Sequence, residues 1–98
     1  MTFRYDKTVD VLDIELIEGV SISRTEQLDS GTLVDLDIHG RVVSIEIIAP
    51  ARAWPLDKII DRFEISEQDQ AVLRSLWSET STYPFAETAT VGAEAATA

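Results

Sequence analysis

The chain has 98 residues, no cysteine, and 8 lysine and arginine residues against 18 aspartate and glutamate residues, which gives a formal net charge of -10 at pH 7. The absence of cysteine excludes disulfides, thiolate metal sites and cysteine nucleophiles. The charge argues against binding to nucleic acid or to an anionic membrane surface, because both depend on lysine and arginine meeting phosphates, and it favours a basic protein partner.

The length and the apolar pattern predict one domain without a membrane span. A chain of this length usually forms a single domain, and 45% hydrophobic residues are enough for a folded core. No apolar run approaches the roughly 20 residues that a membrane-spanning helix needs. The first six residues lack the apolar stretch of a signal peptide. We therefore expect a cytoplasmic protein.

Three short strands are predicted before residue 27. Residues 3–6 form an aromatic strand, and residues 11–16 alternate between apolar and acidic side chains. This alternation is typical of a strand with one buried face, so the two segments predict a hairpin. Residues 20–26 alternate more weakly, which indicates a strand near an edge of the sheet, where polar residues prevent unwanted pairing.

Residues 33–48 give the strongest structural signal in the chain. His39-Gly40 separates two runs of valine, leucine and isoleucine, which predicts a two-residue turn between antiparallel strands. Such a turn pairs Ile38 with Arg41, Leu36 with Val43, Val34 with Ile45, and Thr32 with Ile47.

Alternation across these two strands then sorts the side chains onto two faces. The predicted core face holds Val34, Leu36, Ile38, Val43, Ile45 and Ile47. The predicted solvent face holds Asp35, Asp37, Ser44 and Glu46. An antiparallel sheet with one wet face shows this pattern.

Two short helices are predicted after residue 54. Pro55 suits a helix start, and the apolar residues that follow have helical spacing: Leu56, Ile59, Ile60 and Phe63. Ser66 with Asp69 resembles a capping box before a second apolar stripe, formed by Val72, Leu73, Leu76 and Trp77. The second helix offers only Arg74 as a cation among acidic residues, so a helix-turn-helix that reads DNA is not expected.

The elements predict an α+β fold: an antiparallel meander sheet of about five short strands, followed by two short C-terminal helices that pack on one face. We assign residues 1–78 to the domain and residues 79–98, rich in alanine and threonine, to a flexible acidic tail. For Tyr83-Pro84-Phe85, docking on the core is favoured over a partner-binding motif, because aromatic side chains gain most by burial. A small core and two open sheet edges make a homodimer as plausible as a monomer.

The acids Asp35, Asp37 and Glu46 are the candidate residues for contact with a metal ion or a basic partner, although exposed acids on a strand are most often simply solvated. Asp35-x-Asp37-x-His39-Gly40, with Glu46, fits the spacing of an EF-hand loop. That loop needs flanking helices, whereas these acids alternate with strand residues, so calcium binding of this kind is not expected. Asp13 and Glu15 form a second carboxylate pair, interpreted as a wet strand face.

The residues predict no catalytic group and no cofactor. His39, the one histidine, lies at a turn without a neighbouring nucleophile or orienting acid, so a structural role as a turn residue is favoured. No glycine-rich phosphate loop is present in the sequence.

The strand motifs also have a counterpart in a known family. They comprise Tyr5-Asp6, Val11-Leu12-Asp13-Ile14 with Leu16, Gly31-x-x-Val34-Asp35-Leu36-Asp37, and Gly40-Arg41-Val42-Val43-x-Ile45-Glu46-Ile47. These motifs resemble the small bacterial proteins grouped as domain-of-unknown-function family 2283, over residues 3–49. The sequence departs from the family pattern at His39, where Asp or Asn is common, and at Asp13, where Tyr is expected.

The resemblance implies the hairpin-rich sheet and no established activity. It also implies cytosolic single-domain proteins, some of them paired with small toxin-like partners. The leading hypothesis is therefore a non-enzymatic, acidic protein-interaction module, of an antitoxin-like kind. A divalent-metal-binding or small hydrolytic protein that uses Asp35, Asp37 and Glu46 is the alternative, and a purely structural homodimer is the third.

Overall fold

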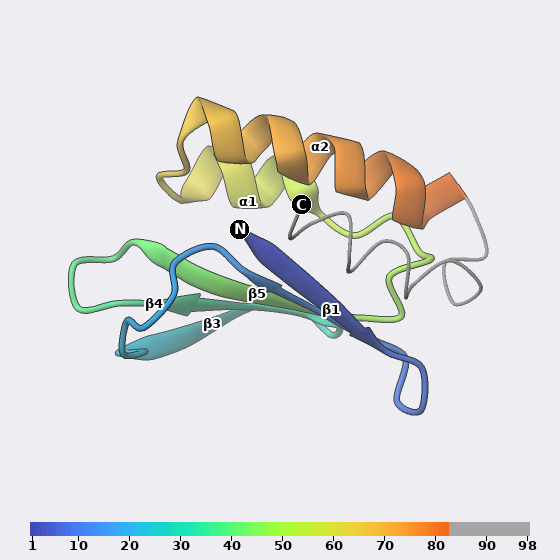
Figure 1. The fold of residues 1–98 in the computed structure, drawn as a ribbon, viewed down its shortest axis with the longest axis horizontal. Helices are drawn as coiled ribbons and strands as arrows, with labels where there is room; N and C mark the ends of the chain where they lie inside the picture. The colour runs from blue at the N-terminus through green and yellow to red at the C-terminus, as the bar shows by residue number, and fades with distance from the viewer. Residues whose placement is uncertain (83–98) are drawn as a thin grey trace.

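A five-stranded antiparallel sheet is followed by two helices in the computed structural model, which describes residues 1–82 (Figure 1). This is the predicted α+β fold. The strands are β1 (Thr2–Asp6), β2 (Val11–Glu15), β3 (Arg24–Asp29), β4 (Thr32–Leu36) and β5 (Val42–Ile48). The helices are α1 (Leu56–Arg62) and α2 (Glu67–Thr82).

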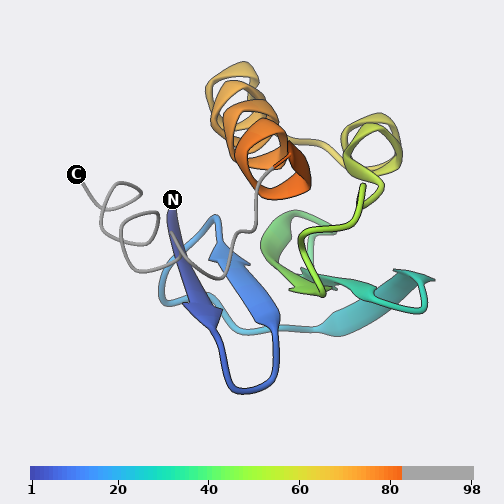
Figure 2. The same cartoon turned by 90° about the vertical axis from the view of Figure 1, so that its right-hand side faces the viewer.

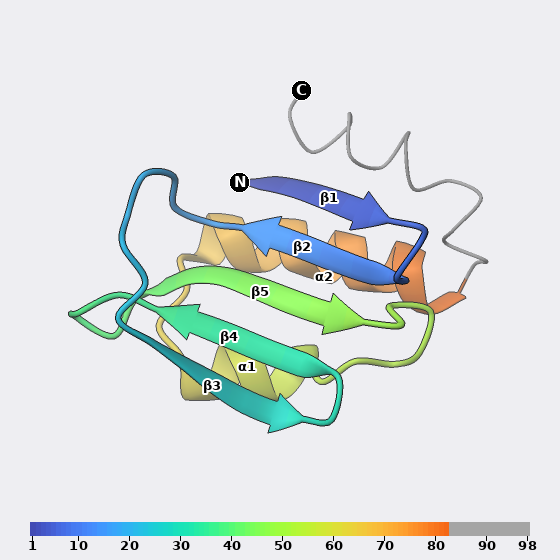
Figure 3. The ribbon, with the colours of Figure 1, turned by 90° about the horizontal axis from the view of Figure 1, so that it is seen from below.

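The strand order differs from the predicted meander. It is β1-β2-β5-β4-β3, so β5 lies at the centre and β3 forms the edge opposite β1 (Figure 3). After β2, the chain passes the ends of β5 and β4: the backbone N–H of Leu16 donates to the Val43 carbonyl, and that of Ser23 donates to the Leu36 carbonyl. Sequence alternation identifies strands but not which strands are neighbours, and here β2 pairs with β5 instead of β3.

The third strand begins later than predicted. Residues 20–23 belong to the connection, and β3 starts only at Arg24. Ile22 is 52% exposed, so its alternation with Val20 did not mark a buried face. The polar edge character that we expected is present, because β3 is built from Arg24, Thr25, Glu26 and Gln27 before Leu28.

The turn at the centre of the chain is also longer than predicted. The backbone N–H of Gly40 donates to the Asp37 carbonyl, and the N–H of Asp37 donates to the Arg41 carbonyl, which closes a three-residue loop. Gly40 has a positive φ of 80°, whereas His39 is not among the residues with positive φ. A two-residue primed turn needs positive φ at both positions, and the three-residue loop needs it only at the glycine.

The longer loop shifts the pairing at one end of the hairpin only. Val34 pairs with Ile45 and Thr32 with Ile47, as predicted, but Leu36 pairs with Val42 because the register shifts between Asp35 and Leu36. Val42 and Val43 are both buried next to this irregularity. Ile38, predicted to be in the core, is instead 81% exposed.

Both helices cover the same face of the sheet (Figures 1 and 2). The core between the two layers contains Leu12, Ile14, Val34, Leu36, Ile45 and Ile47 from the sheet, and Trp54, Leu56, Ile59, Phe63, Ile65, Leu73 and Leu76 from the helical part. The predicted helix stripes therefore face the core, apart from Val72, which is 38% exposed. The backbone N–H of Asp69 donates to Ser66 Oγ at 3.2 Å, which confirms the predicted cap.

The second helix extends past the predicted end of the domain. It continues through residues 79–82, which the sequence pattern assigns to the tail, and the Thr80 side chain is fully buried. Trp54 Nε1 donates to Thr80 Oγ1 at 2.9 Å, and Trp77 Nε1 donates to the Trp54 carbonyl at 2.7 Å. These bonds fix the end of α2 to the segment before α1. The predictions for residues 83–98, including Tyr83-Pro84-Phe85, lie outside the described residues.

Within residues 1–82, neither helix combines the length and the apolar character that crossing a bilayer requires.

Candidate functional site

The face of the sheet opposite the helices is the candidate site (Figure 3). Cross-strand pairing places one complete row of five residues on this face: Arg4, Asp13, Glu46, Leu33 and Gln27. A second row lies beside it: Thr2, Glu15, Ser44, Asp35 and Thr25. Directly paired residues point to the same side of a sheet. We call these ten residues the open face.

Four carboxylates and a single cation lie on the open face. Asp13 and Glu46 are directly opposite each other on β2 and β5, and Glu15 and Asp35 flank Ser44 in the next row. Like charges that face each other across a strand pair lower stability. Arg4 lies opposite Asp13 and is the one cation in the two rows.

The other cations of the described chain are mostly engaged away from this face. Five of the eight cations form ion pairs within residues 1–82, and their acidic partners are Glu26, Asp29, Asp37 and Asp57. None of these partners belongs to the open face. The four carboxylates of this face therefore carry negative charge that those cations do not neutralise.

Hydroxyl groups hold the Asp35 carboxylate in place on the open face. Thr25 Oγ1 donates to Asp35 Oδ1, and Ser44 Oγ donates to Asp35 Oδ2, both at 2.6 Å. Asp35 and Glu46 are diagonal neighbours, because Asp35 pairs with Ser44 and Glu46 pairs with Leu33. Both acids are half-buried.

Apolar side chains adjoin the carboxylates. Leu33 sits within the first row, opposite Glu46. Val11 and Ile48 pair with each other beyond that row, and Ile48 is 40% exposed. A short apolar strip formed by Val11, Leu33 and Ile48 thus adjoins the carboxylates of the open face.

Asp37, the third predicted acid, is not on the open face. It is 2% exposed, at the base of the loop that joins β4 and β5. Its Oδ1 accepts the backbone N–H groups of His39 and Arg41, at 2.9 and 2.8 Å, and its Oδ2 accepts Arg41 Nε at 2.7 Å. The two-residue turn would have pointed this acid into solvent; the three-residue loop uses it to satisfy its own backbone.

These contacts shift the pKa of the Asp37 carboxyl. Removal from water raises the pKa of the Asp37 carboxyl. The hydrogen bonds from the Arg41 backbone, the Arg41 guanidinium and the His39 backbone lower it by more than this, so the net result is a pKa below the ordinary value of 3.8. The charged form is thus the one that the folded state stabilises. Asp37 contributes stability above pH 3.8, and this contribution is lost as the pH falls through its folded-state pKa.

Replacing Asp37 with asparagine should therefore destabilise the protein more at neutral pH than in acid. The amide can still accept a backbone N–H but cannot pair with the Arg41 guanidinium, so the difference in unfolding free energy from the wild type should shrink below pH 4. Urea unfolding at pH 7 and pH 3 measures this difference. Asp61→Asn, which removes an exposed charge on α1, is the control for general charge effects. A difference that stays constant with pH would contradict the assigned role.

The three predicted acids do not form one metal site. Asp35 is held by Thr25 and Ser44, and Asp37 is turned into its loop. Within the part of the chain that the structure describes, no group of three or more histidine, cysteine, aspartate or glutamate residues is arranged to hold a metal ion. His39 is exposed beside Asp37 and makes its bond to that acid through the backbone, as a turn residue does.

The sequence does not reveal that the carboxylates of β2 belong to this site. Its alternation predicts that Asp13 and Glu15 point outward, but a meander places β2 beside β3. The pairing of β2 with β5 puts Asp13 opposite Glu46 and joins the two carboxylate pairs into one patch. The signal in the sequence was that residues 11–16 and 42–48 share the same pattern of apolar and polar alternation.

Comparison with known proteins links the strand region to a protein family. Residues 2–49 match the family model described as "Protein of unknown function (DUF2283)". This segment contains all five strands and ends one residue after β5. Neither the curated proteins nor the solved structures include a significant match to the chain.

Proposed function

From the premise that the chain belongs, through residues 2–49, to the DUF2283 family of proteins of unknown function, we propose that it is a non-enzymatic interaction module whose open face binds a basic protein. The partner presents lysine and arginine side chains to Asp13, Glu15, Asp35 and Glu46. The apolar strip of Val11, Leu33 and Ile48 receives an apolar part of the same partner. An antitoxin that neutralises a small basic toxin is the narrower form of this proposal.

The opposition of Asp13 and Glu46 is the observation that carries the proposal. Two like charges at directly paired positions cost stability in the free protein. A cation placed between them by a partner would relieve the repulsion, so the cost in the free protein becomes a gain on binding. Carboxylate–guanidinium contacts also accelerate and orient association, and they weaken as salt is added.

The fixed geometry of the open face supports recognition of a defined partner. The Asp35 carboxylate is fixed by two hydroxyl groups, so less side-chain freedom is lost when a guanidinium binds to it. The face is built on strands of a sheet that is packed on its other side by the helices. Sites on regular elements keep their geometry better than sites on loops.

Capture of partners from the source cell at low salt tests the proposal. The bait is the full chain, compared with an open-face variant that combines Asp13→Asn, Glu15→Gln and Glu46→Gln. A matched variant with Asp61→Asn, Glu64→Gln and Glu79→Gln removes the same number of charges from exposed positions of the helical layer. We expect a basic protein to bind the wild type and the matched variant, to be lost from the open-face variant, and to dissociate at high salt.

Two results would contradict the proposal. One is recovery of no basic protein at low salt. The other is equal recovery by the open-face and matched variants, which would mean that net charge alone attracts the protein. Circular dichroism of each variant establishes that it is folded before the comparison is made.

The alternative function is a metal-binding or hydrolytic protein. A thermal-shift series with magnesium, calcium, manganese and zinc distinguishes it from the interaction module. A ligand that binds only the folded state raises the unfolding midpoint. The arrangement of Asp35 and Asp37 favours no shift, whereas a saturable increase that Glu46→Gln abolishes would favour the alternative. The homodimer remains a prediction, and sedimentation equilibrium of the free protein measures it.

A further inference from the structure

A hollow on the helical side of the molecule is separate from the open face. It has a volume of ≈ 500 Å³, which is within the range of about 300–1,000 Å³ that small-molecule sites occupy. Its apolar wall is formed by the segment that leads into α1, the first residue of that helix and one side of α2, and it consists of Ala53, Trp54, Pro55, Leu56 and Trp77. The hollow therefore has the size and the lining that an apolar ligand needs.

The two indole rings of this wall are held in place from inside the protein. Trp54 is 1% exposed, and its Nε1 donates to Thr80 Oγ1. Trp77 is half-buried, and its Nε1 donates to the Trp54 carbonyl. Because both indole N–H groups are used within the protein, the wall offers ring surface and no indole donor. A ligand must find its polar contact at the border of the hollow.

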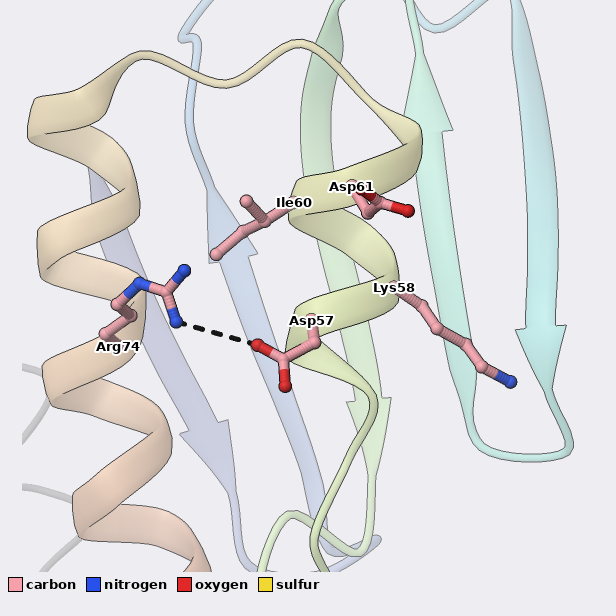
Figure 4. A pocket seen from close by; sticks show the side chains of 5 residues that line it. All are labelled: Asp57, Lys58, Ile60, Asp61 and Arg74. Atoms are coloured by element: carbon pink, nitrogen blue, oxygen red, sulfur yellow. Dashed lines mark ion pairs between the residues drawn. The ribbon is translucent and has the colours of Figure 1, made fainter.

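That border carries two cations and one carboxylate. Arg74 lies on α2, and Asp57 and Lys58 lie on α1. Arg74 points toward Asp57, whereas Lys58 points away from α2 (Figure 4). Arg74 Nη1 and Asp57 Oδ1 are 3.6 Å apart, and their side chains are 57% and 95% exposed. An ion pair this long and this exposed contributes little to stability, so the carboxylate of a ligand can replace Asp57 at the guanidinium with little loss.

The charges favour an anionic ligand over a cationic one. An aromatic wall can bind a cation over its rings, but the two cations at the border would repel it. A neighbouring hollow of ≈ 510 Å³ shares Arg74, Lys58 and Asp57 and adds the carboxylate of Asp61 (Figure 4). There the acids balance the cations, and Ile60 is the one apolar residue among the described residues that line it. Of these two hollows, the first combines an excess of positive charge with an aromatic wall.

We propose that this first hollow binds a small molecule that combines a flat apolar ring with a carboxylate. The ring packs against Trp77, and the carboxylate accepts hydrogen bonds from the Arg74 guanidinium, whose planar N–H groups match two carboxylate oxygens. The chain as a whole has a net charge of -10, which repels anions. Selection for an anionic ligand therefore depends on the local charge of Arg74.

Titration of the full chain with 2-naphthoate, followed by nuclear magnetic resonance, tests this proposal. The protein has two tryptophans, and both line the hollow. We expect a saturable shift of the Trp77 indole N–H signal, which Trp77→Phe identifies. Arg74→Gln should weaken binding roughly tenfold, because it removes the charge-assisted hydrogen bonds. Arg24→Gln is the matched control, since Arg24 lies on β3 and is 61% exposed, and it should leave binding unchanged.

The charge of the probe and of the site provides a second readout. The neutral 2-naphthamide should bind more weakly than 2-naphthoate, and the cation 2-naphthylmethylammonium should bind more weakly still. Asp57→Asn should tighten the binding of 2-naphthoate, because it removes the carboxylate that competes for Arg74. The open-face variant should bind 2-naphthoate like the wild type, since its three substitutions lie on the other side of the sheet.

Three results would overturn the proposal. The first is the absence of any shift of either indole signal at millimolar 2-naphthoate. The second is equal weakening by Arg74→Gln and Arg24→Gln, which would mean that overall charge alone controls binding. The third is binding of 2-naphthylmethylammonium that is at least as tight as that of 2-naphthoate. None of these results bears on the basic partner of the open face.

Discussion

Replacing Ile45 with alanine should lower the free energy of unfolding by about 2–5 kcal/mol. Ile45 lies on the central strand β5, is fully buried, and pairs with Ile14 on one side and Val34 on the other. Truncation leaves a cavity that the neighbouring strands cannot close, because their hydrogen bonds fix their positions. A domain near this size has a net stability of about 5 kcal/mol, so the variant should be largely unfolded or close to it.

Urea unfolding followed by far-ultraviolet circular dichroism measures the loss. Ile48→Ala is the matched control, because it makes the same substitution on the same strand at a position that is 40% exposed. Its cost should be about 1 kcal/mol or less. If the two variants lost similar stability, Ile45 would not occupy the centre of the core, and the assignment of the two faces of β5 would be wrong.

Replacing Thr80 with valine should cost about 1–3 kcal/mol, although valine fills almost the same space. The Thr80 hydroxyl accepts the Trp54 indole N–H at 2.9 Å in a fully buried position. Valine leaves that donor without a partner and without access to water. The same hydroxyl donates to the Trp77 carbonyl at 3.3 Å, so the substitution also weakens the last turns of α2.

Thr80→Ser separates the hydrogen bond from packing, because it keeps the hydroxyl and removes only a methyl group, at a cost of about 1 kcal/mol. Thermal unfolding gives the order of stability, which should be wild type, then serine, then valine. Hydrogen exchange at the Trp54 indole should accelerate in the valine variant alone. A valine variant at least as stable as the serine variant would show that the indole N–H does not depend on Thr80.

The core of the sheet could be predicted from the sequence because alternation has a local cause. Side chains of a strand point to opposite sides in turn, so alternation within each strand is enough to predict a common buried face for its apolar residues, whichever strands lie beside it. This applies to Leu12, Ile14, Val34 and Ile45. The helix stripes followed in the same way from a repeat of 3.6 residues, and Leu56, Ile59 and Leu73 are all buried as expected. The Ser66 cap was also readable, since it involves residues only three positions apart.

The candidate site was only half predictable. Asp35 and Glu46 were placed correctly on the outer face of one hairpin, whose two strands are adjacent in sequence. Asp13 and Glu15 lie next to Asp35 and Glu46 only because β2 pairs with β5. These two strands are separated by β3 and β4 in the chain, so their pairing is not evident from the sequence. Asp37 was misplaced because its carboxylate binds two backbone N–H groups of its own loop, and this changes the loop length.

The sequence by itself determined that five strands precede two helices, which face of most of these elements is apolar, and that the chain carries an excess of acids without cysteine. These properties follow from periodicity and composition, which act over a few neighbouring residues. Tertiary structure alone decided the order of the strands, the burial of Asp37, the continuation of α2 to Thr82 and the assembly of the four carboxylates on one face. Each of these depends on hydrogen bonds and packing between segments distant in sequence, or on the competition between side chain and backbone within one loop.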